Sequence, residues 1–207
     1  MVKAIIFDYD GTISDSLDIK TEAFAQLYSP YGQEIVEKVV KYHTLNGGVS
    51  RFEKFRFFHE KLLNTSINDS EIETLVIKFS NIVMEKVSSA AFIPGAFEFI
   101  LNYSSVYDLY VSTATPTFEI IEILKRNKLI EFFKDIKGSP DNKTSHVRQI
   151  MLKESYKANE VIFIGDSKSD EIAATNNNIN FIKVIKGHSK IEKNKIPNLL
   201  NLNNIIQ

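Results

Sequence analysis

The chain has no cysteine among its 207 residues. This absence excludes disulfide bonds, catalysis by a thiolate and zinc sites built on cysteine. It also fits a reducing compartment, where disulfides do not persist. Long apolar runs are missing too, because no stretch approaches the roughly 18 residues that a membrane-spanning helix requires.

An excess of one charge is likewise absent. The chain has 25 Lys and Arg against 26 Asp and Glu, which leaves a formal net charge of −1. Nucleic-acid-binding proteins usually carry a basic excess, so we expect no nucleic-acid partner. The first residues hold one lysine and too few apolar residues for a signal peptide. We therefore predict a cytoplasmic protein with no membrane partner.

What the chain does have is a hydrophobic fraction of 43%, enough for a sizeable core. Short apolar segments alternate with helical patterns, which is typical of βαβ units and a parallel sheet. The predicted strands are Lys3–Asp8, Leu109–Thr113, Val161–Gly165 and Phe181–Ile185, with a further short strand around Asp135–Lys137. The sequence therefore predicts an α/β protein with a Rossmann-like parallel sheet.

The interval from residue 16 to 91 has no convincing strand pattern. It is predicted to form amphipathic helices at Ile19–Tyr28, Ile35–His43, Arg51–Leu63 and Ser70–Val87. Ser70 and Glu73 fit a capping box at the start of the last helix. We therefore predict a core of residues 1–15 and 92–207, with an inserted all-helical cap subdomain of residues 16–91.

Two carboxylates follow the first predicted strand, in the run Asp8-Tyr9-Asp10-Gly11-Thr12. Strand alternation places Asp8 and Asp10 on the same side, at the strand end where open α/β sheets build their sites. Two acids this close repel each other unless a cation lies between them or one is protonated. The pair therefore predicts a divalent metal beside a carboxylate that can attack phosphorus.

Polar groups also follow the other predicted strands. The second strand ends in the hydroxyl-rich residues 112–115, before a helix whose N-terminal amides favour an anion. The turn at 138–143 brings Lys143 to a helix start, and a glycine turn brings Asp166 and Asp170 after a later strand. Because the ends of parallel strands share one edge, we expect all these groups in one crevice.

The ordered set resembles the four motifs of the haloacid dehalogenase (HAD) superfamily: Asp8-x-Asp10-Gly11-Thr12, Thr113, Lys143 and Gly165-Asp166-x-x-x-Asp170. The resemblance spans residues 3 to about 185. The helical insert is similar to the superfamily's C1-type cap, as in phosphoglycolate phosphatases and β-phosphoglucomutases. Each motif alone is weak, whereas the set in this order is specific.

The resemblance implies a Mg²⁺-dependent phosphatase that acts on a small phosphorylated metabolite through an aspartyl-phosphate on Asp8. Asp10 is then the general acid that protonates the leaving group and later activates water. The implied metal ligands are the Asp8 carboxylate, the backbone carbonyl of Asp10, and Asp166. Asp170 supports the metal's waters or holds Lys143.

The resemblance also implies a phosphate-binding set. Lys143 neutralises Asp8 and the phosphoryl oxygens, and Thr113 donates to one of those oxygens. Strand alternation favours Thr113 over Ser112, which should face the other side of the strand. The backbone amides of the set come from Gly11, Thr12 and Ala114.

In the predicted cap, the glycine turn before Arg51 resembles a loop that some mutases and phosphatases of the group use to reach the substrate. The planar fork of Arg51 suits a carboxylate or a second phosphate, so we predict that it contacts the substrate. His43 and the phenylalanines that follow Arg51 are interpreted as structural.

Several other activities are weighed against this one. Dehalogenation is disfavoured, because dehalogenases of the superfamily lack an acid at the position of Asp10. Phosphonate-cleaving relatives use a cap lysine as a Schiff base, and neither Lys41 nor Lys54 is singled out by its neighbours. A phosphomutase remains an alternative, as does a catalytically weak binding or regulatory protein.

Overall fold

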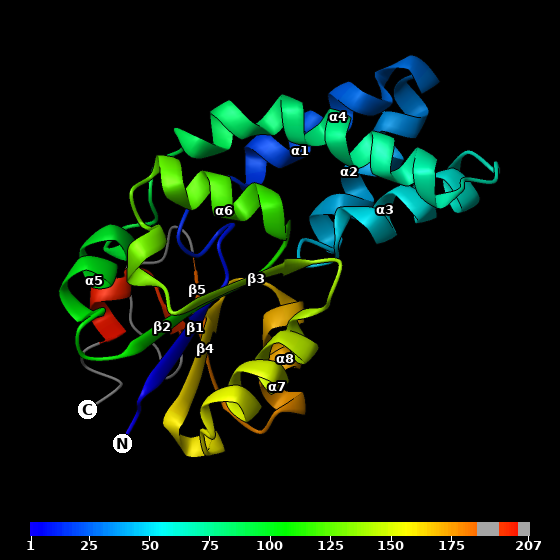
Figure 1. The fold of residues 1–207 in the computed structure, drawn as a ribbon. Helices are drawn as coiled ribbons and strands as arrows, with labels where there is room; N and C mark the ends of the chain where they lie inside the picture. The colour runs from blue at the N-terminus through cyan, green and yellow to red at the C-terminus, as the bar shows by residue number, and fades with distance from the viewer. Residues whose placement is uncertain (186–194, 203–207) are drawn as a thin grey trace.

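The computed structural model describes residues 1–185 and 195–202. It confirms the α/β prediction, since six strands form one parallel sheet in the order β3-β2-β1-β4-β5-β6 (Figure 1). The strands are β1 (Ala4–Phe7), β2 (Asp108–Pro116), β3 (Asp135–Ser139), β4 (Val161–Gly165), β5 (Asn180–Val184) and β6 (Lys195–Ile196). Strand β6 is not among the predicted strands, because two residues are too few to show an alternating pattern.

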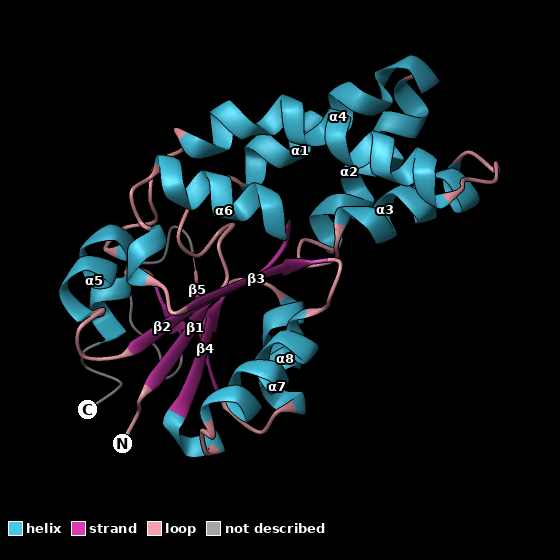
Figure 2. Cartoon of the chain, viewed as in Figure 1, coloured by secondary structure: helices cyan, strands magenta, loops and turns pink. Residues whose placement is uncertain are grey.

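Helices cover both faces of the sheet (Figure 2). One face carries α5 (Ala96–Tyr103) and α6 (Thr117–Arg126), and the other carries α7 (Lys143–Glu154) and α8 (Lys168–Asn176). In β1, Ile5 and Phe7 join the core cluster on the first face, whereas Ala4 and Ile6 join the cluster on the second. The uninterrupted apolar sequence of β1 thus serves two packed layers.

The interval between residues 16 and 91 forms a helical bundle beyond the carboxyl ends of the strands (Figure 1). Its elements are α1 (Leu17–Tyr28), η1 (Ser29–Tyr31), α2 (Gln33–Leu45), α3 (Arg51–Phe57), η2 (Phe58–Leu62) and α4 (Asp69–Ser88). Phe24, Phe55 and Phe79 are buried in its centre, with the Phe24 and Phe79 ring centroids 4.3 Å apart. These aromatic side chains are core residues of the bundle.

Helix α4 begins earlier than its sequence pattern predicts. The capping box predicted at Ser70 and Glu73 is instead formed by Asn68 and Glu71. The Asn68 side chain accepts the Glu71 N–H at 3.0 Å, and the Glu71 carboxylate accepts the Asn68 N–H at 2.9 Å. Both pairs have the same spacing, and Asn caps a helix as well as Ser does.

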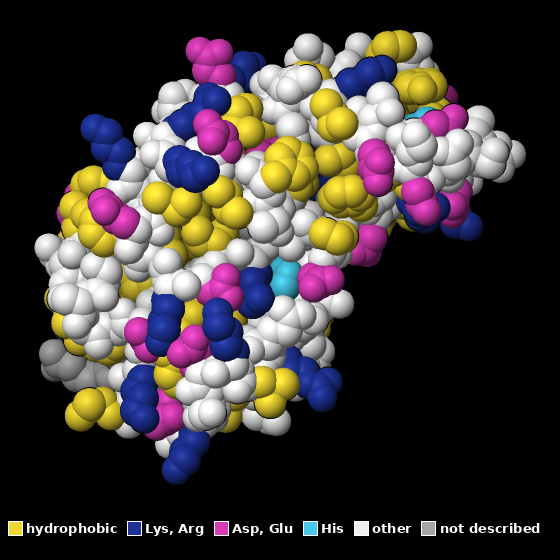
Figure 3. All heavy atoms as spheres, viewed as in Figure 1, with side chains coloured by type: hydrophobic (Ala, Val, Ile, Leu, Met, Phe, Trp, Pro, Cys, Tyr) yellow, Lys and Arg dark blue, Asp and Glu magenta, His cyan; other side chains and the backbone are white. Residues whose placement is uncertain are grey.

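Within residues 1–185 and 195–202, the helices are too short or too polar to cross a bilayer. On the face drawn in Figure 3, basic and acidic side chains are interspersed rather than gathered by sign. This face therefore offers no extended basic surface of the kind that binds nucleic acid.

Candidate active site

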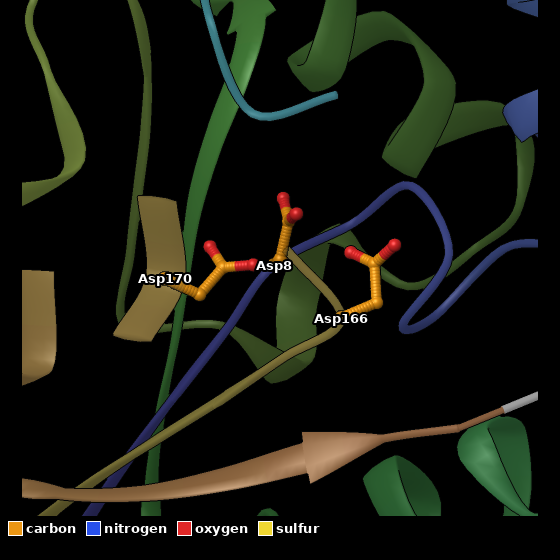
Figure 4. Close-up of side chains that lie close together, drawn as sticks. All are labelled: Asp8, Asp166 and Asp170. Atoms are coloured by element: carbon orange, nitrogen blue, oxygen red, sulfur yellow. The ribbon is translucent and has the colours of Figure 1, made fainter. Parts of the chain in front are cut away.

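Three carboxylates meet at the carboxyl edge of the sheet (Figure 4). Asp8 directly follows β1, Asp166 follows β4, and Asp170 lies in the first turn of α8. One oxygen from each carboxylate lies within 4.8 Å of the others. Asp8 is only 4% exposed. The structure thus brings together three acids that the sequence predicts around a metal.

Lys143, the first residue of α7, supplies a cation to this cluster. Its Nζ lies 2.7 Å from Asp8 Oδ2 and 2.6 Å from Asp170 Oδ1. Burial alone would lower the pKa of Lys143, but the two carboxylates raise it above its ordinary value, so the lysine stays charged. The second oxygen of Asp170 accepts the Ser167 N–H at 2.9 Å and its hydroxyl at 2.6 Å. Asp170 therefore fixes the position of Lys143 and of the loop at Ser167 that follows β4.

The remaining charge of the cluster is unbalanced. Burial, followed by the neighbouring carboxylates, raises the pKa of Asp8 well above its usual range, against the opposing effect of Lys143. Burial and then Asp170 raise the pKa of Asp166 to about 6. Three acids around one lysine leave an excess of negative charge, and oxygen ligands are those that Mg²⁺ prefers. The donor set fits a magnesium ion held by Asp8 and Asp166.

Asp10 points away from these acids. Its Oδ2 accepts Lys20 Nζ at 2.5 Å and the Thr115 hydroxyl at 2.9 Å, and its Oδ1 accepts the Ser16 hydroxyl at 2.5 Å. Burial alone would raise the pKa of Asp10, but Lys20 and the hydroxyl donors hold it at about 2. The Asp10 carboxylate is therefore not a metal ligand here, which leaves only its backbone carbonyl for that part.

Lys20 is a site residue that the sequence analysis missed. It lies in α1 one helical turn before Phe24, on the buried face of the helix. Its Nζ also lies 2.6 Å from the Thr115 hydroxyl, 95 residues away in the sequence. A lysine on an apolar helix face was the available signal, but nothing local identified its partners.

The two hydroxyls of β2 face opposite sides, as strand alternation predicts. Ser112 Oγ lies 3.0 Å from His146 Nδ1, on the α7 side of the sheet. Thr113 lines an outer cleft of about 200 Å³ together with Lys143 and Ala114. The register with β3 is interrupted between Ser112 and Pro116, so Ala114 lies at a bulge of the kind that redirects a strand end.

This set of groups, in this order along the chain, matches a known protein family. The model of the haloacid dehalogenase-like hydrolases matches residues 5–184. The chain belongs to this family. Among curated proteins, YfnB of Bacillus subtilis, which carries the name HAD-hydrolase, is 26% identical over 149 residues. That match covers 67% of this chain and 62% of YfnB, so the chain spans less than two thirds of its relative.

Solved structures of HAD proteins share the fold over nearly the whole chain. A CbbY variant of Rhodobacter sphaeroides in complex with xylulose-(1,5)-bisphosphate has a TM-score of 0.77 at 15% identity, covering 98% of this chain and 96% of its own. A predicted phosphoglycolate phosphatase of Haemophilus somnus has a TM-score of 0.76 at 19% identity, covering 100% and 98%. Magnesium-bound YfnB has a TM-score of 0.71 at 21% identity, covering 99% and 98%. At these identities the likeness establishes the fold.

Two glycines let the loops of this HAD protein close around the acids. Gly11 has φ 76°, a conformation that favours glycine, and a Cβ there would lie 2.5 Å from Asp166 Oδ2. A Cβ at Gly165 would overlap the side chain of Asp170. The glycines of the first and last motifs are therefore required by close approach to the carboxylates.

The amides predicted at Gly11 and Thr12 are not available to a phosphate. The Gly11 N–H donates to the Ser14 carbonyl at 2.8 Å, and the Thr12 N–H donates to the Tyr9 carbonyl at 3.4 Å. The Thr12 side chain is fully buried. The tight turn after β1 uses these donors to close itself, and this geometry counts against the predicted phosphate contacts.

Arg51 is not available either. Its guanidinium donates to both oxygens of Glu119 on α6, at 2.6 and 2.7 Å, and to the Ser80 hydroxyl at 3.0 Å. It also lies 4.4 Å from the centroid of the Phe79 ring. The Arg51 guanidinium does bind a carboxylate, as the sequence predicts, but that carboxylate is the side chain of Glu119 and not part of a substrate. Arg51 therefore ties α3 to α6, and this geometry counts against the predicted substrate contact.

We expect Mg²⁺ to raise the thermal midpoint of unfolding. An ion that binds only the folded state adds about 2.7 kcal/mol at 100 times its Kd, which is worth several degrees in a domain of this size. Because protons compete for Asp166, whose pKa is about 6, the increase should grow as the pH rises through that value. Thermal scans in Mg²⁺ and in EDTA measure it, and Asp166→Asn should remove it. An equal midpoint in both solutions contradicts the metal site.

Proposed function

We propose that this HAD protein is a Mg²⁺-dependent phosphatase that hydrolyses a small-molecule phosphomonoester through an aspartyl-phosphate on Asp8. The observation that carries the proposal is that two neighbouring acids, Asp8 and Asp10, have different partners. Asp8 lies against Lys143 in the acid cluster, whereas Asp10 is turned toward Lys20 and two hydroxyls. We take this difference in partners to support Asp8 as the nucleophile and Asp10 as a separate acid and base.

In the proposed reaction, an oxygen of Asp8 forms a bond to phosphorus while the bond from phosphorus to the leaving-group oxygen breaks. Asp10 is ionised in the free protein. The anionic substrate raises the pKa of Asp10 on binding, so that this carboxylate takes up a proton from the solvent and gives it to the leaving-group oxygen. Asp10 then takes a proton from the water that attacks the phosphoryl group, which restores the Asp8 carboxylate and releases phosphate. Lys143 and Thr113 stabilise the charge on the phosphoryl oxygens.

Bound Mg²⁺ would supply positive charge that lets the anionic nucleophile and the anionic phosphoryl group approach each other. Asp8, Asp166 and the Asp10 carbonyl would hold it, while Asp170 positions Lys143. We assign residues 16–91 as the cap and residues 1–15 with 92–207 as the core. A cap over the strand ends excludes bulk water and favours a small metabolite over a protein or nucleic acid. A cytoplasmic location belongs to the same proposal.

The alternatives lose support. The phosphomutase alternative depended on a substrate contact by Arg51, which is paired with Glu119. A binding protein without catalysis has no need for Asp10 held as an acid–base group beside Asp8. Hydrolysis is therefore the function favoured by the arrangement of the site.

The test is phosphate release from a panel of phosphorylated metabolites, with Mg²⁺ and with EDTA. We expect release that requires Mg²⁺ and differs between metabolites. An isomerisation assay on sugar phosphates, with and without a bisphosphorylated sugar, is run beside it. Isomerisation without net phosphate release identifies a mutase, and the absence of both reactions contradicts the proposal.

Replacing Lys20 should shift the pH dependence of turnover. In Lys20→Met the Asp10 carboxylate loses its charged partner, so its pKa rises from about 2 and the acidic limb of the profile moves to higher pH. We also expect kcat to fall about 10²-fold, the lower end of the roughly 10²–10⁴-fold that general acid–base catalysis contributes, because Asp10 keeps its two hydroxyl partners. The control is Lys38→Met, on the exposed side of α2. A lower kcat with an unmoved acidic limb would assign Lys20 to structure alone.

A further inference from the structure

A second, smaller cavity lies beside the acid–base residue. It has a volume of about 40 Å³, and its lining includes Asp10, Lys20, Lys54 and His43. It shares Ala114 with the outer cleft that Lys143 lines. A leaving group protonated by Asp10 would therefore be adjacent to this cavity, which extends from the phosphoryl site into the helical bundle.

Three basic side chains line this inner cavity, and two of them already have acidic partners. Lys20 pairs with Asp10, and Arg51 pairs with Glu119. Lys54 differs from both. Its Nζ lies 2.9 Å from His43 Nδ1 and 3.4 Å from the Gly47 carbonyl, and both of these partners are neutral.

Among the described residues, no Asp or Glu carboxylate forms an ion pair with Lys54, whereas Lys20, Arg51 and Lys143 each have an acidic partner. The lysine is only 2% exposed. Burying an ammonium group without an opposite charge is costly, so such a group is retained where something compensates for it. The ring of Phe24, 5.7 Å from Nζ, compensates only in part.

The surroundings of Lys54 keep it close to losing its proton. Burial, then Lys20 and Arg51, lower its pKa to about 7, while Asp10 acts in the opposite sense and Lys143 adds a small repulsion. Burial and Lys54 itself lower the pKa of His43 to about 3, so the imidazole is neutral and its Nδ1 can accept from the ammonium. An incoming anion would restore the full charge on Lys54.

We propose that Lys54, positioned by His43, binds a second anionic group on the leaving-group part of the substrate. The substrate class is then a phosphomonoester that also carries a carboxylate or a further phosphate. The proposal rests on the phosphatase function and adds its specificity. A cavity of about 40 Å³ holds about three water-sized groups, which is the size of a carboxylate, whereas a second phosphate requires the helical bundle to move outward.

The test compares Lys54→Met with Lys41→Met, which removes an exposed lysine from α2. Three substrates of similar length serve as probes: a phosphorylated hydroxy acid, a bisphosphate and a phosphorylated uncharged alcohol. In Lys54→Met we expect KM to rise on the order of ten- to hundredfold for an anionic probe, with little change for the uncharged one. Lys54→Arg should recover part of the affinity. In the wild type, KM for the anionic probe should rise as the pH increases above about 7.

Calorimetric binding of the same probes without Mg²⁺ separates this proposal from the phosphatase function. Weaker binding of only the anionic probes in Lys54→Met supports the subsite even if phosphate is never released. Equal changes for all three probes, in KM and in binding, overturn it and assign Lys54 to packing around His43. Asp8-dependent release would then still support the phosphatase.

Discussion

Asp8→Asn is expected to abolish Mg²⁺-dependent phosphate release, with kcat reduced by about 10⁴-fold or more, as is usual when a nucleophile is removed. The amide keeps the size of the side chain but cannot attack phosphorus, and it loses the charge that pairs with Lys143 at 2.7 Å. Because the proposed reaction passes through a covalent bond to Asp8, the loss of phosphate release should appear for every substrate and at every pH.

The same change should not unfold the protein. Asp8 is buried beside Asp166 and Asp170, and these surroundings raise its pKa well above the ordinary value. Removing one negative charge relieves that repulsion, so we expect an unchanged or higher thermal midpoint in EDTA. The matched control is Asp18→Asn, an exposed carboxylate in the first turn of α1. Phosphate release by Asp8→Asn at the wild-type rate would contradict the assignment of Asp8 as the nucleophile.

Arg51→Met is expected to destabilise the fold, because it breaks the buried ion pair between Arg51 and Glu119. Glu119 is 0% exposed and receives two hydrogen bonds from Arg51. Arg51→Met leaves that carboxylate buried with Ser80 as its remaining partner. Breaking a buried ion pair from one side costs about 3–5 kcal/mol, so we expect the thermal midpoint to fall by roughly 6–20 °C in a chain of this length.

A double-mutant cycle gives this prediction its control. Glu119→Gln alone leaves the guanidinium partly unpaired, and Arg51→Met with Glu119→Gln removes both charges. The double variant should be more stable than Arg51→Met. If Arg51→Met instead keeps its thermal midpoint and only raises KM, Arg51 contacts the substrate as the sequence predicted, and its pairing with Glu119 contributes little.

The parallel sheet and the acid cluster could be predicted because both depend on local signals. β1 and β4 are uninterrupted apolar runs that end in a carboxylate, Asp8 in one case and Asp166 in the other. Parallel connections then require these ends to meet at one edge. Lys143 and Asp170 follow from the same rule, since each lies in the first turn of a helix that returns from that edge.

What could not be predicted are the partners formed across the interface between the helical bundle and the sheet. The Arg51 side chain meets Glu119 across 68 residues, and Lys20 meets Thr115 across 95. Sequence periodicity shows only that these basic residues lie on apolar helix faces. It does not show which opposite group they reach, so Arg51 was assigned to the substrate and Lys54 was left without a role.

The turn after β1 illustrates a different limit. Gly11 lies close to Asp166, but its amide donates to the Ser14 carbonyl within the turn. A motif identifies which residues gather at a site. The number of free donors there depends on how the turn closes, and that is settled by backbone geometry.

The most direct test of the central claim is to identify the phosphorylated residue during turnover. The wild-type protein is mixed with its best substrate and Mg²⁺, quenched in acid within the first turnover, and digested for peptide mass spectrometry. We predict one added phosphoryl group on Asp8, absent in EDTA and absent from Asp8→Asn. A phosphoryl group on Thr113 or any other residue, or turnover with no phosphorylated peptide, would contradict the account.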